Sequence, residues 1–332
     1  MIGWGIWYIF THPEELATIR DLSSGWLFLL FVLSTVKLIS MGVFTKIIVT
    51  AFDIKLGFRE WFGLSAMSAM GNYLTPFRGG AAVRAVYLKS RHNLSYSSFL
   101  STLSALYVLT FSTSAMLGLL ATLGLYLQFD ILETTLLVFF SILLCLPIVL
   151  LLSTRIVPSL ETCSEKLETA NTSVANWRKK LFLHTSLRLT QVLTRILEGW
   201  RIISNHRGVP FWLILVSVSN ACATLMMIHF SLAAFHIDLP LIESLVLSSL
   251  FMVSSMIPIT PSGLGIAEAA IILAAQEFVT DNTLTGLSVG LNRSIMILSS
   301  IVWGALFSHA LGHQHNTPSG DHPRNPITKL AP

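Results

Sequence analysis

The stretch Gly71-Asn72-Tyr73-Leu74-Thr75-Pro76-Phe77-Arg78-Gly79-Gly80-Ala81-Ala82-Val83-Arg84 interrupts an otherwise hydrophobic sequence with a proline, glycines and two arginines. Proline cannot continue a helix, and glycine lets the backbone take positive φ or approach a neighbour closely. A second stretch, Thr260-Pro261-Ser262-Gly263-Leu264-Gly265-Ile266-Ala267-Glu268, repeats the order of Thr-Pro, glycines and one ionised residue. Two interrupted, charged segments in the two halves of a membrane chain indicate a transport site.

The composition is that of an integral membrane protein. Hydrophobic residues make up 53% of the chain and charged residues only 11%, and the mean hydropathy is +0.70. Ordinary soluble domains are about 25% charged. The net charge of +4 is therefore interpreted as basic cytoplasmic loops that fix the orientation. No nucleic-acid partner is expected.

Long apolar runs predict an all-α, polytopic membrane helix bundle, because a helix needs about 20 apolar residues to cross a bilayer. The expected spanning helices are 24–50, 98–127, 134–152, 210–235 and 285–310. Together with shorter apolar segments they form a single integral membrane domain over residues 1–311. The polar, proline-rich tail 312–332 is expected to be disordered.

Basic residues predict the orientation of the chain in the cell membrane. The polar region 153–208 is rich in Lys and Arg and is therefore expected to be cytoplasmic, as is the C-terminal tail. Its second half has apolar residues at helical spacing, which predicts an interfacial helix on the inner membrane face or, alternatively, a solvated basic linker helix. These residues are Leu189, Leu193, Ile196, Trp200 and Ile203.

The two interrupted stretches are expected to form re-entrant hairpins, at about 61–88 and 241–278. Basic residues flank the first hairpin on both sides, so its two ends lie on the cytoplasmic side. The flanks of the second hairpin lie on the outer side by the same count. Non-helical backbone at membrane depth must be buried in protein or line a wet cavity. The opposite entry of the two hairpins suggests an inverted repeat.

Ionised side chains within the apolar segments are the main candidates for a substrate-binding site, because each costs about 2.5 to 3.5 kcal/mol to insert. They are Lys37, Arg78, Arg84, Glu268 and Arg293. Their surplus of positive charge suits a phosphate or carboxylate ligand. The two breaks add residues that shape the backbone or contact the ligand: Asn72, Thr75, Pro76, Gly80, Thr260, Pro261, Gly263 and Gly265.

Each candidate also has a purely structural interpretation. Either motif could be a proline kink that packs one helix against another. Lys37 could snorkel along its helix, and Arg84 could anchor the chain at the membrane interface. A salt bridge between Glu268 and Arg293 could serve helix packing alone.

Enzymatic and metal-binding patterns are not found in the sequence. There is no glycine-rich phosphate loop, and no nucleophile has a base in view. The cysteines lack the spacing of a metal site, and the C-terminal histidines lack carboxylate or cysteine support. We therefore expect no enzyme activity, cofactor or metal. The histidines are His309, His313, His315 and His322.

Both motifs resemble signatures of the lysylphosphatidylglycerol synthase transmembrane-domain family. The stretch 74–85, with Asn72 before it, resembles the pattern Pro-Gly-Arg-x-Gly-Glu-x-x-Arg-Ala, and 258–270 resembles Pro-x-Thr-Pro-Gly-Gly-Leu-Gly-x-x-Glu-Ala. The chain departs from these patterns in having Phe77 for Gly, Ala81 for Glu and Ala267 for a frequent Arg. Matching positions are Arg78, Gly80, Arg84, Gly263, Gly265 and Glu268, and Arg293 falls where the family often has an arginine.

The resemblance implies a membrane domain that moves a phospholipid or other phosphorylated lipid between leaflets. Some members are fused to an aminoacyl transferase, and this chain would be a stand-alone member. The leading hypothesis is therefore a flippase or translocase for an anionic phospholipid or lipid-linked phosphate. Two alternatives remain open: the membrane subunit of an aminoacyl- or glycosyl-transferase system with a separate lipid-modifying enzyme, and an ion-coupled solute transporter that uses Glu268.

Overall fold

The computed structural model describes residues 22–75, 78–129, 134–153, 194, 197–257, 259–279 and 281–314, without the side chains of 129, 146–153 and 310–314. Within these ranges every regular element is a helix. This confirms the predicted all-α fold. Residues 1–21, most of the predicted cytoplasmic loop 153–208, and Pro76 lie outside the described residues.

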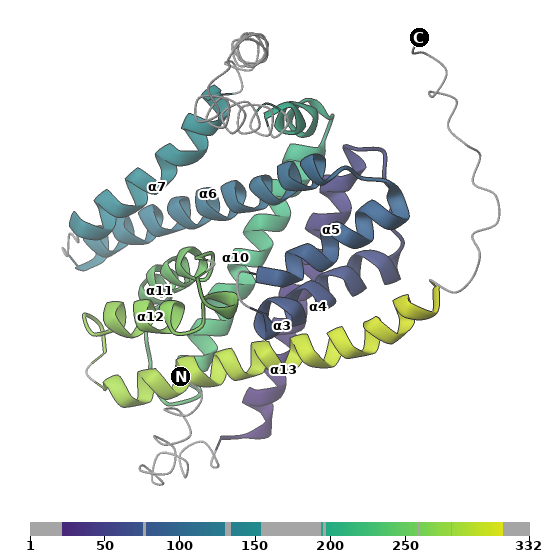
Figure 1. Cartoon of the computed structure of the whole chain (residues 1–332). Coiled ribbons are helices and arrows are strands. Elements are labelled where there is room, and N and C mark those ends of the chain that lie inside the picture. The colour runs from purple at the N-terminus through teal and green to yellow at the C-terminus, as the bar shows by residue number, and fades with distance from the viewer. Residues whose placement is uncertain are drawn as a thin grey trace, which may run out of the picture.

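Long helices form the frame of the molecule (Figure 1). Helices α3 (Ser24–Thr50), α6 (Tyr96–Phe129), α10 (Val209–Ala233) and α13 (Asn282–Gln314) are long and apolar enough to cross a membrane. Helix α7 (Thr134–Ser153) packs beside α6. The helices begin and end within four residues of the predicted bounds, because uninterrupted apolar runs set those bounds.

The predicted boundary between the last helix and the disordered tail lies a few residues too early. Helix α13 continues to Gln314, three residues into the segment 312–332. The first proline of that segment is Pro318. Proline lacks the backbone N–H group that a helix needs, but no proline stands in the first residues of this segment. The helical hydrogen bonds of α13 can therefore continue into it.

Two pairs of shorter helices lie within this frame. The first pair is α4 (Phe58–Leu74) with α5 (Gly79–His92). The second is α11 (Leu241–Ser254) with α12 (Ile266–Ala275), joined through the 3-10 turn η3 (Pro261–Gly263). Figure 1 shows the pairs at opposite ends of the frame, with their breaks turned toward each other. Both breaks fall in the predicted motifs, whereas the inverted repeat stays a prediction.

Glycine lets the first pair close tightly. A Cβ atom on Gly80 would lie 1.8 Å from the carbonyl oxygen of Ser68, and one on Gly71 would lie 2.9 Å from the Cα of Gly80. The backbone of α5 therefore rests directly on α4. Only a residue without a side chain allows such an approach.

The end of the predicted cytoplasmic loop packs on the frame. Residues 197–205 are helical, and Trp200 and Ile203 are buried in the same core as Phe99 of α6. The Trp200 Nε1–H group donates a hydrogen bond to Ser104 Oγ over 2.8 Å. The helical spacing around Trp200 is therefore confirmed, but protein covers this apolar face. The residues Leu189, Leu193 and Ile196 lie outside the described ranges.

Candidate functional site

A cavity of about 170 Å³ lies where the breaks of the two helix pairs meet the long helices. Three cationic side chains line it: Lys37 of α3, Arg78 before α5 and Arg293 of α13. No carboxylate belongs to the described part of this lining. Its neutral polar residues are Ser34, Asn72, Tyr73, Thr110, Asn220, Thr224, Ser255, Ser262 and Ser300.

Arg78 connects the two breaks. Its backbone is left-handed, with φ 55° and ψ 49°, which is uncommon for a residue other than glycine. From there the guanidinium donates through Nη2 to the carbonyl oxygen of Ser255, at 2.5 Å, and through Nη1 to the hydroxyl of Tyr107, at 3.3 Å. Ser255 follows the last residue of α11. The first broken helix therefore binds an end of the second. The Arg78 Nε–H group is buried and has no hydrogen-bond partner among the described residues.

Arg293 is held in place by Glu268. Its side chain is 5% exposed and forms an ion pair with Glu268 Oε1 through Nε. Its Nη1 donates to the hydroxyl of Tyr73 over 3.4 Å. Glu268 Oε2 accepts the N–H group of Gly265 over 2.6 Å, which caps the first turn of α12. The carboxylate therefore fixes both the helix start and the arginine, whose Nη2 is buried without a partner in the described structure.

Lys37 is the third cation of the cavity. Its Nζ lies 5.4 Å from the centre of the Phe251 ring, a distance at which the ring face attracts a cation. Within the described residues it has no hydrogen-bond acceptor and no carboxylate partner. Lys37 thus faces the protein interior, and its ammonium donors are available to a ligand.

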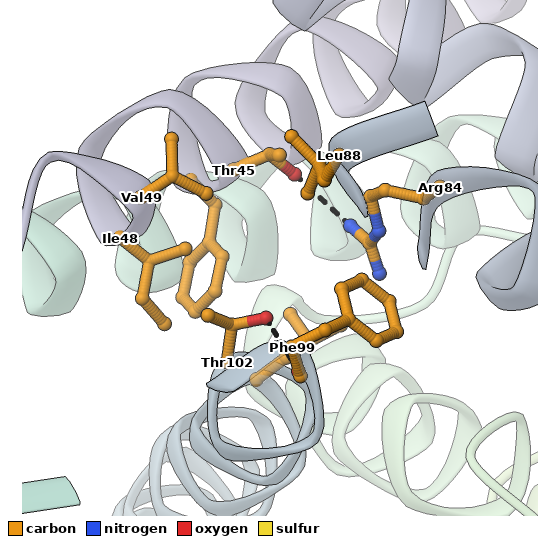
Figure 2. Close-up of a pocket in the computed structure, with 9 residues that line it drawn as sticks. Thr45, Ile48, Val49, Arg84, Leu88, Phe99 and Thr102 are labelled. Carbon is orange, nitrogen blue, oxygen red and sulfur yellow. Dashed lines mark hydrogen bonds between the residues drawn. The ribbon is translucent and has the colours of Figure 1, made fainter. Parts of the chain in front are cut away.

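Arg84 occupies a different place, shown in Figure 2. Its Nη1 donates to Thr45 Oγ1 over 3.0 Å, and its guanidinium lies 5.6 Å from the centre of the Phe99 ring. The space beside it measures about 10 Å³, which is about the room that one water needs. Arg84 is 6% exposed and does not line the central cavity. The structure therefore places it outside the lining of the central cavity.

The remaining predicted site residues divide into lining and framework. Asn72 lines the cavity, and its Oδ1 is buried without a partner among the described residues. Thr75 is exposed and donates to the carbonyl oxygen of Gly71 over 2.6 Å. The others shape the backbone around the breaks or lie beside them without lining the cavity: Gly80, Thr260, Pro261, and the positive-φ glycines Gly263 and Gly265.

Tyr73, Ser255 and Asn220 are among the lining residues that were not predicted from the sequence. Tyr73 and Ser255 contact the arginines directly, and Asn220 contributes an amide from the middle of α10. An asparagine inside the apolar run of α10 could have been recognised as a site residue, because a polar side chain at membrane depth usually faces a cavity or a polar partner. Ser255 offered no such signal, since its contribution is a backbone carbonyl.

The cavity is chemically suited to an anion with several oxygen atoms. Buried polar groups are nearly always hydrogen-bonded, yet Arg78 Nε and Arg293 Nη2 have no partners in the part of the chain that the structure describes. Charged donors form their strongest bonds with carboxylate or phosphate oxygens. Within the described residues, no three His, Cys, Asp or Glu side chains group as metal ligands.

These features define a multi-pass helical membrane protein with a cationic cavity between two broken helix pairs. The model of the lysylphosphatidylglycerol synthase TM region family matches residues 2–304, and the chain belongs to that family. The matched range includes both motifs and every residue of the cavity. Membership indicates a role related to membrane lipids. No curated protein and no solved structure shows significant similarity to the chain.

Proposed function

We propose that the chain is a flippase, which moves a lipid with an anionic phosphate head group between the two leaflets of the cell membrane. The observation that carries the proposal is the cavity in which Lys37, Arg78 and Arg293 meet without a carboxylate in the described lining. A head group that leaves water loses its hydration shell, and the fixed cationic donors of the cavity replace the hydrogen bonds that water made. The acyl chains stay in the bilayer throughout.

The broken helix pairs support this proposal. Their breaks meet at the cavity through the hydrogen bond between Arg78 and Ser255. Helix breaks at mid-membrane that point at an anionic group are typical of transporters, where one element rocks against another around a fixed site. The proposed cycle has no covalent step, so the head group is bound and released unchanged.

Leaflet exchange of a fluorescent lipid provides the test. The purified chain is reconstituted into phosphatidylcholine vesicles that contain a trace of acyl-labelled anionic phospholipid, and a membrane-impermeant quencher reports the fraction exposed outside. We expect exchange well above that of protein-free vesicles. Replacing Arg78 by Gln should slow it by about tenfold or more, as expected when one charged hydrogen bond to the head group is lost.

Arg59→Gln is the matched control. Arg59 is exposed in the first turn of α4 and does not line the cavity, so this substitution removes the same charge away from the site. Its exchange should equal that of the unmodified chain. Exchange at the protein-free rate for every anionic lipid would refute the proposal. So would equal rates for the two variants, provided that both fold.

A further inference from the structure

We infer that the head group bound in the central cavity is a lipid phosphomonoester, in preference to a phosphodiester or an amine-bearing head group. This inference rests on the proposed function and narrows its substrate. It follows from the charge of the cavity wall, the number of its free donors, and its volume.

With a ligand bound, the wall presents up to two positive charges that no described carboxylate balances. Glu268 neutralises Arg293 through their ion pair. Lys37 and Arg78 have no carboxylate partner within the described residues, and the nearest oxygen partners of Arg78 are a neutral carbonyl and a hydroxyl. The ligand that leaves the least uncompensated charge in this low-dielectric space therefore carries two negative charges.

Head groups differ in how well they meet this requirement. A phosphomonoester carries about −1.5 to −2 near neutral pH, because its second pKa is about 6. A phosphodiester carries one negative charge, and an attached ammonium group cancels it. An aminoacylated diester with two ammonium groups would bring positive charge to a wall that is already positive, and no described carboxylate lines the cavity to receive it.

The free donors point to the same ligand. Among the described residues, Arg293 Nη2 and Arg78 Nε are buried without partners, and the Lys37 ammonium has no acceptor. These donors come from three elements, so they approach a ligand from separate directions. A phosphomonoester presents three terminal oxygens as acceptors, whereas a diester has only two that are not esterified.

The volume limits what else can enter. At about 170 Å³ the cavity is close to the size of an engineered cavity of about 150 Å³ that holds benzene. A phosphate with its first carbon atoms matches that size. Pockets for drug-sized ligands measure about 300 to 1,000 Å³, so a phosphate that also carries glycerol and an amino acid would have to extend beyond this cavity.

The test compares lipids that differ only in the head group. Phosphatidylcholine vesicles with the full chain receive acyl-labelled phosphatidic acid, phosphatidylglycerol, phosphatidylethanolamine or lysylphosphatidylglycerol, at about pH 7.5 where the monoester is doubly charged. We expect phosphatidic acid to exchange about tenfold faster than phosphatidylglycerol after subtraction of protein-free rates. The two amine-bearing lipids should exchange more slowly still. A parallel set of vesicles measures entry of labelled inorganic phosphate, the soluble form of the same chemistry.

Lys37→Gln is the informative variant, with Lys46→Gln as its control, because Lys46 is exposed on the same helix. Loss of one wall charge should slow phosphatidic acid and reduce its advantage over phosphatidylglycerol to about twofold or less. The control should keep the full preference. A shift in preference, unlike a general loss of rate, does not arise from poor folding.

Each outcome separates this inference from the proposed function. If phosphatidylglycerol or lysylphosphatidylglycerol exchanges as fast as phosphatidic acid, the monoester assignment is wrong while the flippase remains. The assignment is also wrong if Lys37→Gln keeps the full preference. If no lipid exchanges, the proposed function itself fails, and entry of inorganic phosphate would then make the chain a carrier of a soluble anion.

Discussion

The two broken helix pairs carry matching sequence features but place their charges differently. Arg84 and Glu268 follow their Thr-Pro dipeptides by similar distances, yet Arg84 contacts Thr45 and Phe99 away from the centre. Glu268 instead turns back on its own helix start and holds Arg293 at the cavity. Position within a motif is therefore a weaker guide to function than the direction that the helix gives the side chain.

Helix geometry explains this difference. Arg78 precedes α5 and faces the cavity, and Arg84 comes six positions later. At about 100° per residue, six positions add roughly 240° beyond a full turn, which directs Arg84 to another face. Glu268 is the third residue of α12, close enough to cap the helix start. The following variants test the contrast, from the largest expected effect to the smallest.

Replacing Arg293 by Ala should have the largest effect on both exchange and stability. The change removes a cation from the cavity and leaves the Glu268 carboxylate without its ion pair. Breaking a buried pair on one side costs about 3 to 5 kcal/mol, and lipid exchange should fall about a hundredfold. Thermal unfolding in detergent and the vesicle assay measure the two effects.

The double variant Arg293→Gln with Glu268→Gln separates these effects. It should recover most of the stability, since neither member of the former ion pair is left charged, but not the exchange. Recovered exchange would mean that Arg293 serves helix packing alone.

Gly80→Ala should destabilise the first pair. The new methyl group would meet the Ser68 carbonyl at 1.8 Å, and overpacking of this kind costs about 1 to 3 kcal/mol or more. Gly290→Ala is the control, because nothing lies within 4 Å of a Cβ atom at that exposed position of α13. It should leave the unfolding temperature unchanged or raise it slightly. A stable Gly80→Ala protein would show that the two helices can separate freely.

Glu60 should make the stability of the first pair depend on pH. It lies in the first turn of α4 and accepts hydrogen bonds from Tyr87 of α5 and from the Gly57 N–H group, with His92 beside it. Burial raises the pKa of the Glu60 carboxyl, but the Gly57 and Tyr87 bonds and the His92 charge outweigh it, so that the pKa lies below the ordinary 4.5.

A lowered pKa means that this stabilisation is complete above the unfolded pKa and is lost as the pH falls through the folded one. Because solvent screens a partly exposed group, its size should be about 1 kcal/mol or less. Unfolding temperatures between about pH 6 and pH 3 should therefore drop more steeply in the unmodified chain than in Glu60→Gln. Parallel curves would contradict a role of the ionised carboxylate.

Arg84→Met should have the smallest effect, in spite of the motif. The change removes a buried charge whose hydrogen bond in the described structure goes to Thr45, and apolar replacements of buried ionic groups are often neutral or stabilising. We expect unfolding within about 1 kcal/mol of the unmodified chain and exchange within about twofold. Loss of exchange in a folded variant would show that Arg84 takes part in transport.

The sequence predicted the frame well because apolar length alone determines a spanning helix. The bounds of α3 were predicted without error, and those of α10 within two residues. The breaks were also predictable, since proline and glycine act locally on the backbone. The site was predicted only in part: Lys37, Arg78 and Arg293 meet at the cavity, but the departure of Arg84 depends on the rotation of α5 after a left-handed residue.

The other unpredicted features are tertiary. The contact from Arg78 to the Ser255 carbonyl joins residues 177 positions apart, and a carbonyl group leaves no trace in a residue pattern. The packing of Trp200 on α6 likewise depends on where the preceding loop returns the chain. Local chemistry fixes where a helix breaks, whereas only the packed structure fixes what the break touches.

The placement of the three cavity cations has a mechanical consequence. Lys37 and Arg293 project from the long helices α3 and α13, but Arg78 stands at the tip of the first pair. Any shift of α4 and α5 along the frame would carry one of the three charges away and leave the other two in place. The positive charge of the cavity therefore depends on the position of Arg78 at the tip of the first pair. The hydrogen bond from Arg78 to Ser255 at the end of α11 holds that tip in the position seen here.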